Sequence, residues 1–167
     1  MIARIAVTCL GAAACGAALM HFAYGPYRCN ATVSRLTART DAAERTAGDY
    51  ERIVRARRNL ADLAGLRDSC PTQVRVPVLI GANQEVLGRL DDAAESYRSA
   101  LEIEQRPEIY MALAKVQIQL GRIDDAVANY VTAARFAPPI VQWIPSADVR
   151  ERVEHDSGIA EAGTPGK

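Results

Sequence analysis

Residues 87–93 read LGRLDDA, and residues 120–126 read LGRIDDA. The two stretches differ at one position, and they begin 33 residues apart. Self-similarity at a fixed period is the signature of repeat architectures, in which each copy is one supersecondary unit. The recurrence therefore predicts two copies of one structural unit, which together span residues 74–139.

The second copy, residues 107–139, has the pattern of two helices joined by a turn. Gly121 is expected to end the first helix, because glycine adopts positive φ without a steric penalty. Asp124 and Asp125 are expected to open the second helix as capping carboxylates at its positive dipole end. Pro138 is expected to stop that helix. The apolar positions of the first helix recur at helical spacing, and they are Ile109, Tyr110, Leu113, Val116 and Leu120.

The first copy, residues 74–106, repeats the key residue types of the second at a constant offset of 33. The matched residues are Gly88, Asp91, Asp92, Ala93, Tyr97 and Ala100 in the first copy, and Gly121, Asp124, Asp125, Ala126, Tyr130 and Ala133 in the second. Alanines at these spacings should let the two helices of a hairpin approach closely, while each large tyrosine fills the space beside them.

This pattern resembles the tetratricopeptide repeat (TPR) family, in which a helix, a glycine turn and a second helix carry Ala, an aromatic residue, Ala and Pro at set spacings. The family's pair of residues in the first helix is similar to Ile80-Gly81 and Leu113-Ala114. The observed period is one residue shorter than the family's, which is about 34 residues. The ankyrin phrase Thr-Pro-Leu-His is absent. The resemblance covers residues 74–139 and implies an all-α fold, a short α-solenoid of helix-turn-helix repeats.

In the TPR family, the first helix of each hairpin lines a concave groove that holds an extended peptide or a partner helix. Carried over by position, the implied groove residues are Val78, Leu79, Ala82, Glu85, Val86, Glu108, Met111, Ala112, Lys115, Ile118 and Gln119. Val78, Ala82 and Ala112 stand where some relatives need Lys and Asn to clamp a C-terminal carboxylate. The resemblance thus implies an apolar groove for a hydrophobic segment of a partner. The alternative is that these residues only pack one repeat against the next.

Two hairpins cannot bury their outer faces, so flanking helices are expected. Residues 28–73 are predicted to form a degenerate hairpin that breaks near Gly48, and the rival is one continuous helix. The hairpin would return Cys70 to the neighbourhood of Cys29 and permit a disulfide, whereas the continuous helix would hold the two thiols far apart. Residues 140–156 are predicted to form a capping helix with Ser146 as its N-cap, and residues 157–167 have the composition of a disordered tail.

Residues 5–24 carry no charge and are long enough to cross a bilayer core of roughly 30 Å as a helix. Residues 1–27 therefore form an expected N-terminal apolar helix, which is either an uncleaved membrane anchor or a cleaved signal sequence. A weak lipoprotein-like box at residues 12–15 is a third interpretation. Cys9 and Cys15 lie inside the apolar run, which leaves Cys29 and Cys70 as the pair that an exported domain would oxidise. We therefore expect an inner-membrane anchor with the soluble part in the periplasm, or secretion after cleavage.

Residue types that carry chemistry are scarce in this sequence. Its two histidines, His21 and His155, have no neighbouring ligand set, and no glycine-rich phosphate loop is present. Net charge is zero, so nucleic acid is not an expected partner. We expect no enzyme activity, metal, cofactor or small-molecule substrate. Arg55, Arg57 and Arg58 form a basic cluster, interpreted as a solvated helix face or as a contact with anionic lipid or a partner.

These observations favour a non-catalytic protein–protein interaction adaptor of the bacterial cell envelope, which binds a partner segment in the implied groove. The alternative is a regulatory subunit of a membrane-bound glycan-assembly or secretion enzyme, with catalysis entirely in the partner. The identity of the dominant binding partner would separate these two functions.

Overall fold

A computed structural model describes residues 29–41 and 48–158 of the chain. The predicted anchor or signal sequence at residues 1–27 and the last residues of the predicted tail, 159–167, lie outside this part. All regular secondary structure in the described residues is helical, as expected for an α-solenoid. Among these helices, none has both the length and the apolar character needed to cross a membrane.

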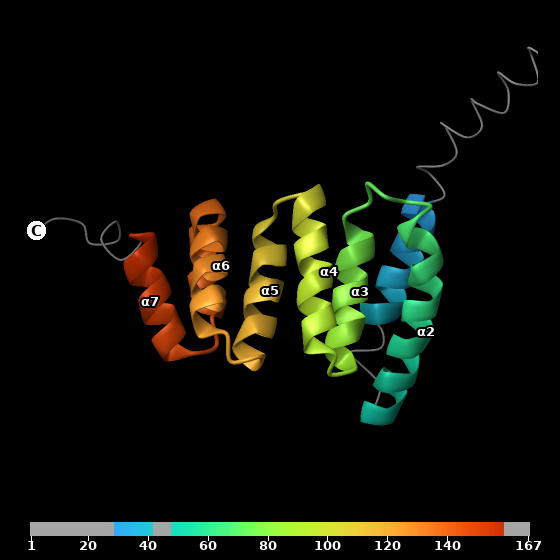
Figure 1. The fold of residues 1–167 in the computed structure, drawn as a ribbon, viewed down its shortest axis with the longest axis horizontal. Coiled ribbons are helices and arrows are strands. Elements are labelled where there is room, and N and C mark those ends of the chain that lie inside the picture. The colour runs from blue at the N-terminus through green and yellow to red at the C-terminus, as the bar shows by residue number, and fades with distance from the viewer. Residues whose placement is uncertain (1–28, 42–47, 159–167) are drawn as a thin grey trace, which may run out of the picture.

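The described helices follow one another along the chain and stand side by side in a row (Figure 1). They comprise a helix at residues 29–41, α2 (Asp49–Arg67), α3 (Arg75–Val86), α4 (Leu90–Ile103), α5 (Pro107–Gln119), α6 (Ile123–Phe136), the 3-10 helix η1 (Pro138–Trp143) and α7 (Ala147–Ser157). From α2 to α6 each helix packs against the next, and α7 packs against α6 and η1. This nearest-neighbour packing is the arrangement of a solenoid.

Two left-handed glycines make the turns within the repeated hairpins. Gly88 has a φ of 69° and Gly121 a φ of 74°, where a residue with a Cβ is strained. After α3, the Arg89 N–H donates to the Gln84 carbonyl and the Gly88 N–H donates to the Glu85 carbonyl, both at 2.9 Å. The same two bonds recur after α5, at 2.8 and 3.0 Å. Both turns are therefore Schellman motifs, which satisfy the last carbonyls of each first helix.

The aspartate pairs do not cap the second helices, so the expected capping role is wrong. The N-cap residues of α4 and α6 are arginines of the Schellman turns, and no side chain caps either helix. The aspartates lie inside the first turn, where their charge still favours the positive end of the helix dipole. Asp91 instead accepts a hydrogen bond from Arg122 at 2.9 Å, and Asp124 accepts one from Arg152 at 2.7 Å. These exposed ion pairs join neighbouring units along the solenoid.

Small side chains and tyrosines fill the interior of the repeats. The four repeat alanines (Ala93, Ala100, Ala126 and Ala133) are completely buried, and Tyr97 and Tyr130 are each only 2% exposed. Gly81 lies directly against the Tyr97 ring, since a Cβ there would stand 2.9 Å from the Cε1 and Cζ atoms. The two helices of the first hairpin thus approach as closely as the absence of a side chain at Gly81 permits.

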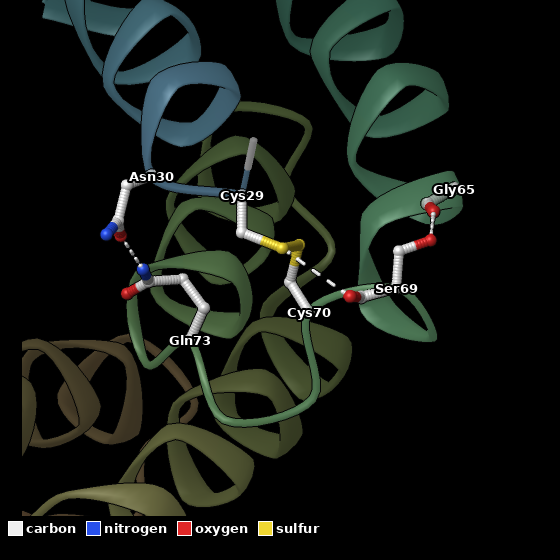
Figure 2. Close-up of a disulfide and its surroundings, with 6 residues drawn as sticks. All are labelled: Cys29, Asn30, Gly65, Ser69, Cys70 and Gln73. Atoms are coloured by element: carbon white, nitrogen blue, oxygen red, sulfur yellow. Dashed lines mark hydrogen bonds between the residues drawn. A yellow bond between two sulfur atoms is a disulfide. The ribbon is translucent and has the colours of Figure 1, made fainter. Parts of the chain in front are cut away.

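A disulfide holds the N-terminal end of the solenoid together (Figure 2). Cys29 and Cys70 are bonded, with a Cα–Cα distance of 5.9 Å and a sequence separation of 41 residues. Gly48 has an extended backbone and precedes α2 as its N-cap. One continuous helix over residues 31–67 could not bring the two sulfurs together, so the bonded pair supports the hairpin interpretation. The core beneath the disulfide includes Val33, Leu63 and Val76, each at most 1% exposed.

The C-terminal end is closed by η1 and α7. The sequence predicted only a stop at Pro138, whereas Pro138 is the first residue of η1. The Ser146 hydroxyl accepts a hydrogen bond from the Val149 N–H at 3.4 Å and so caps α7, as expected. Ile144 and Val153 are completely buried in the same cluster as α6 residues, which shields the outer face of the last repeat.

Candidate functional site

The groove residues implied by the sequence all lie on α3 and α5, the first helices of the two repeated hairpins. Leu79 does not belong with the others, because it is 7% exposed and packs in the N-terminal core cluster with Val33, Leu36 and Leu63. Its position is explained by the preceding hairpin, which covers that side of α3. The remaining ten residues define what we call the α3–α5 face: Val78, Ala82, Glu85, Val86, Glu108, Met111, Ala112, Lys115, Ile118 and Gln119.

The α3–α5 face is accessible over part of its area. Its exposed members are Val86, Glu108, Lys115 and Gln119, and its half-buried members are Val78, Ala82, Glu85, Met111, Ala112 and Ile118. Met111 and Ile118 pack on the C-terminal core cluster, while Val78 and Ala112 pack on the central one. Inter-repeat packing and solvent exposure therefore coexist on this face, so the two interpretations of these residues are not exclusive.

Glu85 is the polar centre of the α3–α5 face. Its carboxylate accepts a hydrogen bond from the Tyr97 hydroxyl at 2.5 Å. The Lys115 ammonium group lies 3.3 Å from the same carboxylate. The Glu85 side chain is 15% exposed and the Lys115 side chain is 60% exposed. This arrangement links α3, α4 and α5, and it places a charged pair within the groove that the resemblance implies to be apolar.

One polar contact joins the two helices of each hairpin in the same way in both copies. The Ser96 hydroxyl donates to the Gln84 side-chain oxygen at 2.7 Å, and 33 residues later the Asn129 amide donates to the Gln117 oxygen at 2.8 Å. The sequence contains a signal for this contact, because Gln84 and Gln117 are identical residues at the repeat offset. Glutamine is not a residue type that the TPR pattern specifies at this position, so the resemblance alone does not predict the contact.

A hollow of about 430 Å³ lies on the side of α5 opposite Lys115, between the second helices of the two hairpins. Leu113 and Gln117 of α5 form part of its lining, and helical periodicity places them away from Lys115. The other lining residues are Arg98, Leu101, Glu102, Gln105 and Asn129. Its lining is a mixture of amides, apolar residues and one charge of each sign, so it shows no constellation for a specific chemistry.

The described residues give no support for catalysis at a metal or an acid–base pair. No group of three His, Cys, Asp or Glu residues within residues 29–41 and 48–158 could hold a metal ion. His155 is exposed and lies 3.0 Å from Asp156, while His21 is outside the described residues. Burial raises the pKa of Tyr130, which keeps its phenol neutral. A hydrogen bond and the nearby charge of Glu104 raise the pKa of Arg106.

Comparison with known proteins adds evidence on the fold. No protein-family model matches the sequence, and a search of curated proteins finds no match. Among solved structures, the chain is similar to a thermophilic TPR protein of Thermus thermophilus. The TM-score is 0.61 at 24% sequence identity, and the alignment covers 86% of this chain and 70% of that protein. The alignment covers more of the chain than residues 74–139, so the structural similarity extends into the flanking helices. The fold is therefore an all-α, TPR-like one.

Proposed function

We propose that the chain is a non-catalytic adaptor of the bacterial cell envelope, which binds a segment of a protein partner on the α3–α5 face. The observation that carries this proposal is the Glu85–Lys115 pair, placed on a face where apolar side chains remain partly open. The half-buried Glu85 carboxylate, which accepts a hydrogen bond from Tyr97, pairs with the lysine, while most of the lysine side chain is exposed. Such a preorganised cation is available to a ligand without a large ordering cost.

The chemistry of the face defines the partner segment. Val86, Met111 and Ile118 offer apolar contacts, and the Lys115 ammonium group has donors beyond the one directed at Glu85. A complementary segment presents apolar side chains together with one carboxylate. This description modifies the sequence-based expectation of a purely hydrophobic segment, because a wholly apolar ligand would cover the remaining Lys115 donors without giving them hydrogen-bond acceptors.

The envelope location is supported by two features of different kinds. The Cys29–Cys70 disulfide suits an oxidising compartment such as the periplasm. The uncharged run at residues 5–24 is suited to an anchor or an export signal. If the run remains as an inner-membrane anchor, it confines the adaptor to the membrane surface and raises its effective concentration toward a membrane-bound partner.

Affinity purification of the full chain from its own envelope tests the function. Lys115→Glu reverses the charge at the centre of the α3–α5 face, and Arg98→Glu makes the same kind of reversal beside the hollow on the opposite side. We expect the wild type and Arg98→Glu to recover the same specific partner in similar amounts. Lys115→Glu should recover at least about tenfold less of that partner. Equal recovery by both variants would refute the assignment of this face. A glycan-assembly or secretion enzyme as the recovered partner would identify the regulatory-subunit form of the function.

A further inference from the structure

An arginine-lined hollow of about 400 Å³ lies at the N-terminal end of the solenoid. Its lining residues are Arg39 from the helix at residues 29–41 and Arg55, Arg58 and Asn59 from α2. Spacings of three and four residues place the α2 members on one side of that helix. Three guanidinium groups from two helices therefore converge on one concave site, which belongs neither to the α3–α5 face nor to the repeats.

Two of these arginines make exposed ion pairs with described residues. Arg39 lies 3.5 Å from Asp62, and Arg55 lies 3.4 Å from Glu51. All four side chains are at least 43% exposed, so water screens both attractions. Within residues 29–41 and 48–158, no carboxylate lies within ion-pair distance of Arg58. The lining therefore carries an excess of positive charge that a bound anion would neutralise.

A buried amide fixes the floor of the hollow. Asn59 is 5% exposed, and its amide donates to the Thr40 hydroxyl and to the Asn83 side-chain oxygen, each at 3.2 Å. The Asn83 amide in turn donates to the Leu79 carbonyl at 2.7 Å. This chain of hydrogen bonds ties α2 to α3 and to the helix at residues 29–41. It fixes the rotation of α2, and with it the direction from which its arginines enter the hollow.

The charge pattern here departs from that of the repeats. In the repeats, Arg122 follows the glycine turn between α5 and α6, and it pairs with Asp91 of the preceding hairpin. Arg89 is the counterpart of Arg122 at the offset of 33, but its neighbours in a smaller hollow of about 140 Å³ include Ile53 and Arg57 rather than an acid. The degenerate hairpin that precedes the repeats thus presents Arg57 where the α3–α4 hairpin presents Asp91. The basic character is specific to this end of the molecule.

We infer that the hollow lined by Arg39, Arg55 and Arg58 binds the phosphate group of a soluble phosphorylated or diphosphate-bearing molecule. Guanidinium forks match the oxygen geometry of phosphate and form charge-assisted hydrogen bonds with it. The arginines line a concave hollow between two helices rather than a flat face, so a small dissolved anion fits better than a lipid surface. The inference is independent of partner binding on the α3–α5 face.

Calorimetric titration of the full chain with pyrophosphate and with inorganic phosphate tests this inference. We expect saturable binding of pyrophosphate at about 0.1 M salt, where the exposed charges are screened beyond about 10 Å. Arg58→Gln should weaken it by at least about fivefold, and Arg58→Lys by a smaller factor because it keeps the charge but loses the fork. Arg57→Gln is the matched control, since it removes an equal charge from the adjacent residue of α2 and should change the affinity less than about twofold.

Three results would overturn the inference. One is the absence of saturable binding of both anions, and another is an equal loss in Arg57→Gln and Arg58→Gln. The third concerns vesicles of phosphatidylcholine with and without about a third phosphatidylglycerol. If Arg58→Gln abolished a preference for the anionic vesicles but left pyrophosphate binding unchanged, the arginines would serve a membrane surface. Helical circular dichroism equal to that of the wild type would show that the exposed Arg58 had been replaced without unfolding.

Discussion

Gly81→Ala is the substitution that most sharply tests the close packing of the first hairpin. A Cβ on residue 81 would stand 2.9 Å from Cε1 and Cζ of Tyr97 and 3.1 Å from its Cδ1. The ring has little room to move, because Tyr97 is 2% exposed and its hydroxyl donates to Glu85 at 2.5 Å. Overpacking of this kind costs about 1–3 kcal/mol. The helix propensity of alanine over glycine returns about 0.8–1 kcal/mol. We expect a net loss of about 1 kcal/mol in the free energy of unfolding.

Gly65→Ala provides the matched control for this substitution. Gly65 also lies within a helix, α2, but nothing stands within 4 Å of the Cβ that alanine would add. The propensity gain is therefore unopposed, and we expect Gly65→Ala to stabilise the chain by about 0.5–1 kcal/mol. The same chemical change thus has opposite signs at two helical positions, which a difference in propensity alone cannot produce.

Urea unfolding of the full chain, followed by far-ultraviolet circular dichroism, measures both effects as shifts of the midpoint at an unchanged slope. A Tyr97→Leu background should reduce the cost of Gly81→Ala, because the contacting ring is gone and the two substitutions are coupled. Stabilisation by Gly81→Ala equal to that by Gly65→Ala would show that the Tyr97 ring does not oppose a Cβ at residue 81. So would a cost for Gly81→Ala that is unchanged in the Tyr97→Leu background.

Three further predictions concern stability. Gly121→Ala should lower the free energy of unfolding by about 1–2 kcal/mol, because the backbone φ is 74° at this position. Gly48→Ala should change the free energy of unfolding little, because φ is −63° there. Thermal unfolding of the two variants checks this difference. Replacing Cys29 and Cys70 with serine should cost about 4 kcal/mol because the bond closes a loop of 41 residues, and a reductant should destabilise the wild type equally but leave the variant unchanged in urea unfolding. Burial raises the folded-state pKa of Tyr130 above the unfolded value of 10.0, so its contribution to stability is complete below that pH and declines as pH rises toward the folded value. Tyr130→Phe should lack this alkaline decline when unfolding is compared on both sides of pH 10, and an identical decline in both proteins would contradict the assignment.

The fold could be predicted to the extent that it depends on local spacing. Gly88 and Gly121 identify the turns because only residues free to adopt positive φ suit a Schellman motif. Alanines and tyrosines at a fixed offset identify the packed side of each hairpin. The aspartate pairs misled the prediction of capping because the backbone of the Schellman turn, rather than the nearest carboxylate, determines which residue precedes the second helix.

The candidate site was less predictable because it depends on contacts between helices. Glu85 and Lys115 are 30 residues apart in the sequence, and only the packing of one repeat on the next brings them together. Leu79 has the helical position of a groove residue, yet it is buried because the degenerate first hairpin covers it. The arginine-lined hollow likewise requires the return of α2 onto the helix at residues 29–41. Repeat register indicates which helix a residue lies on, but the flanking unit decides which of its faces remains open.

Site-specific photo-crosslinking in living cells tests partner binding on the α3–α5 face most directly. A photoreactive amino acid would replace Val86 or Gln119, both exposed on this face, and in parallel Glu95 or Ala128, both exposed on the second helices of the hairpins. We expect one discrete crosslinked partner from residues 86 and 119 and none from residues 95 and 128. Crosslinks to a discrete partner only from residues 95 and 128, or equally from all four positions, would contradict this expectation.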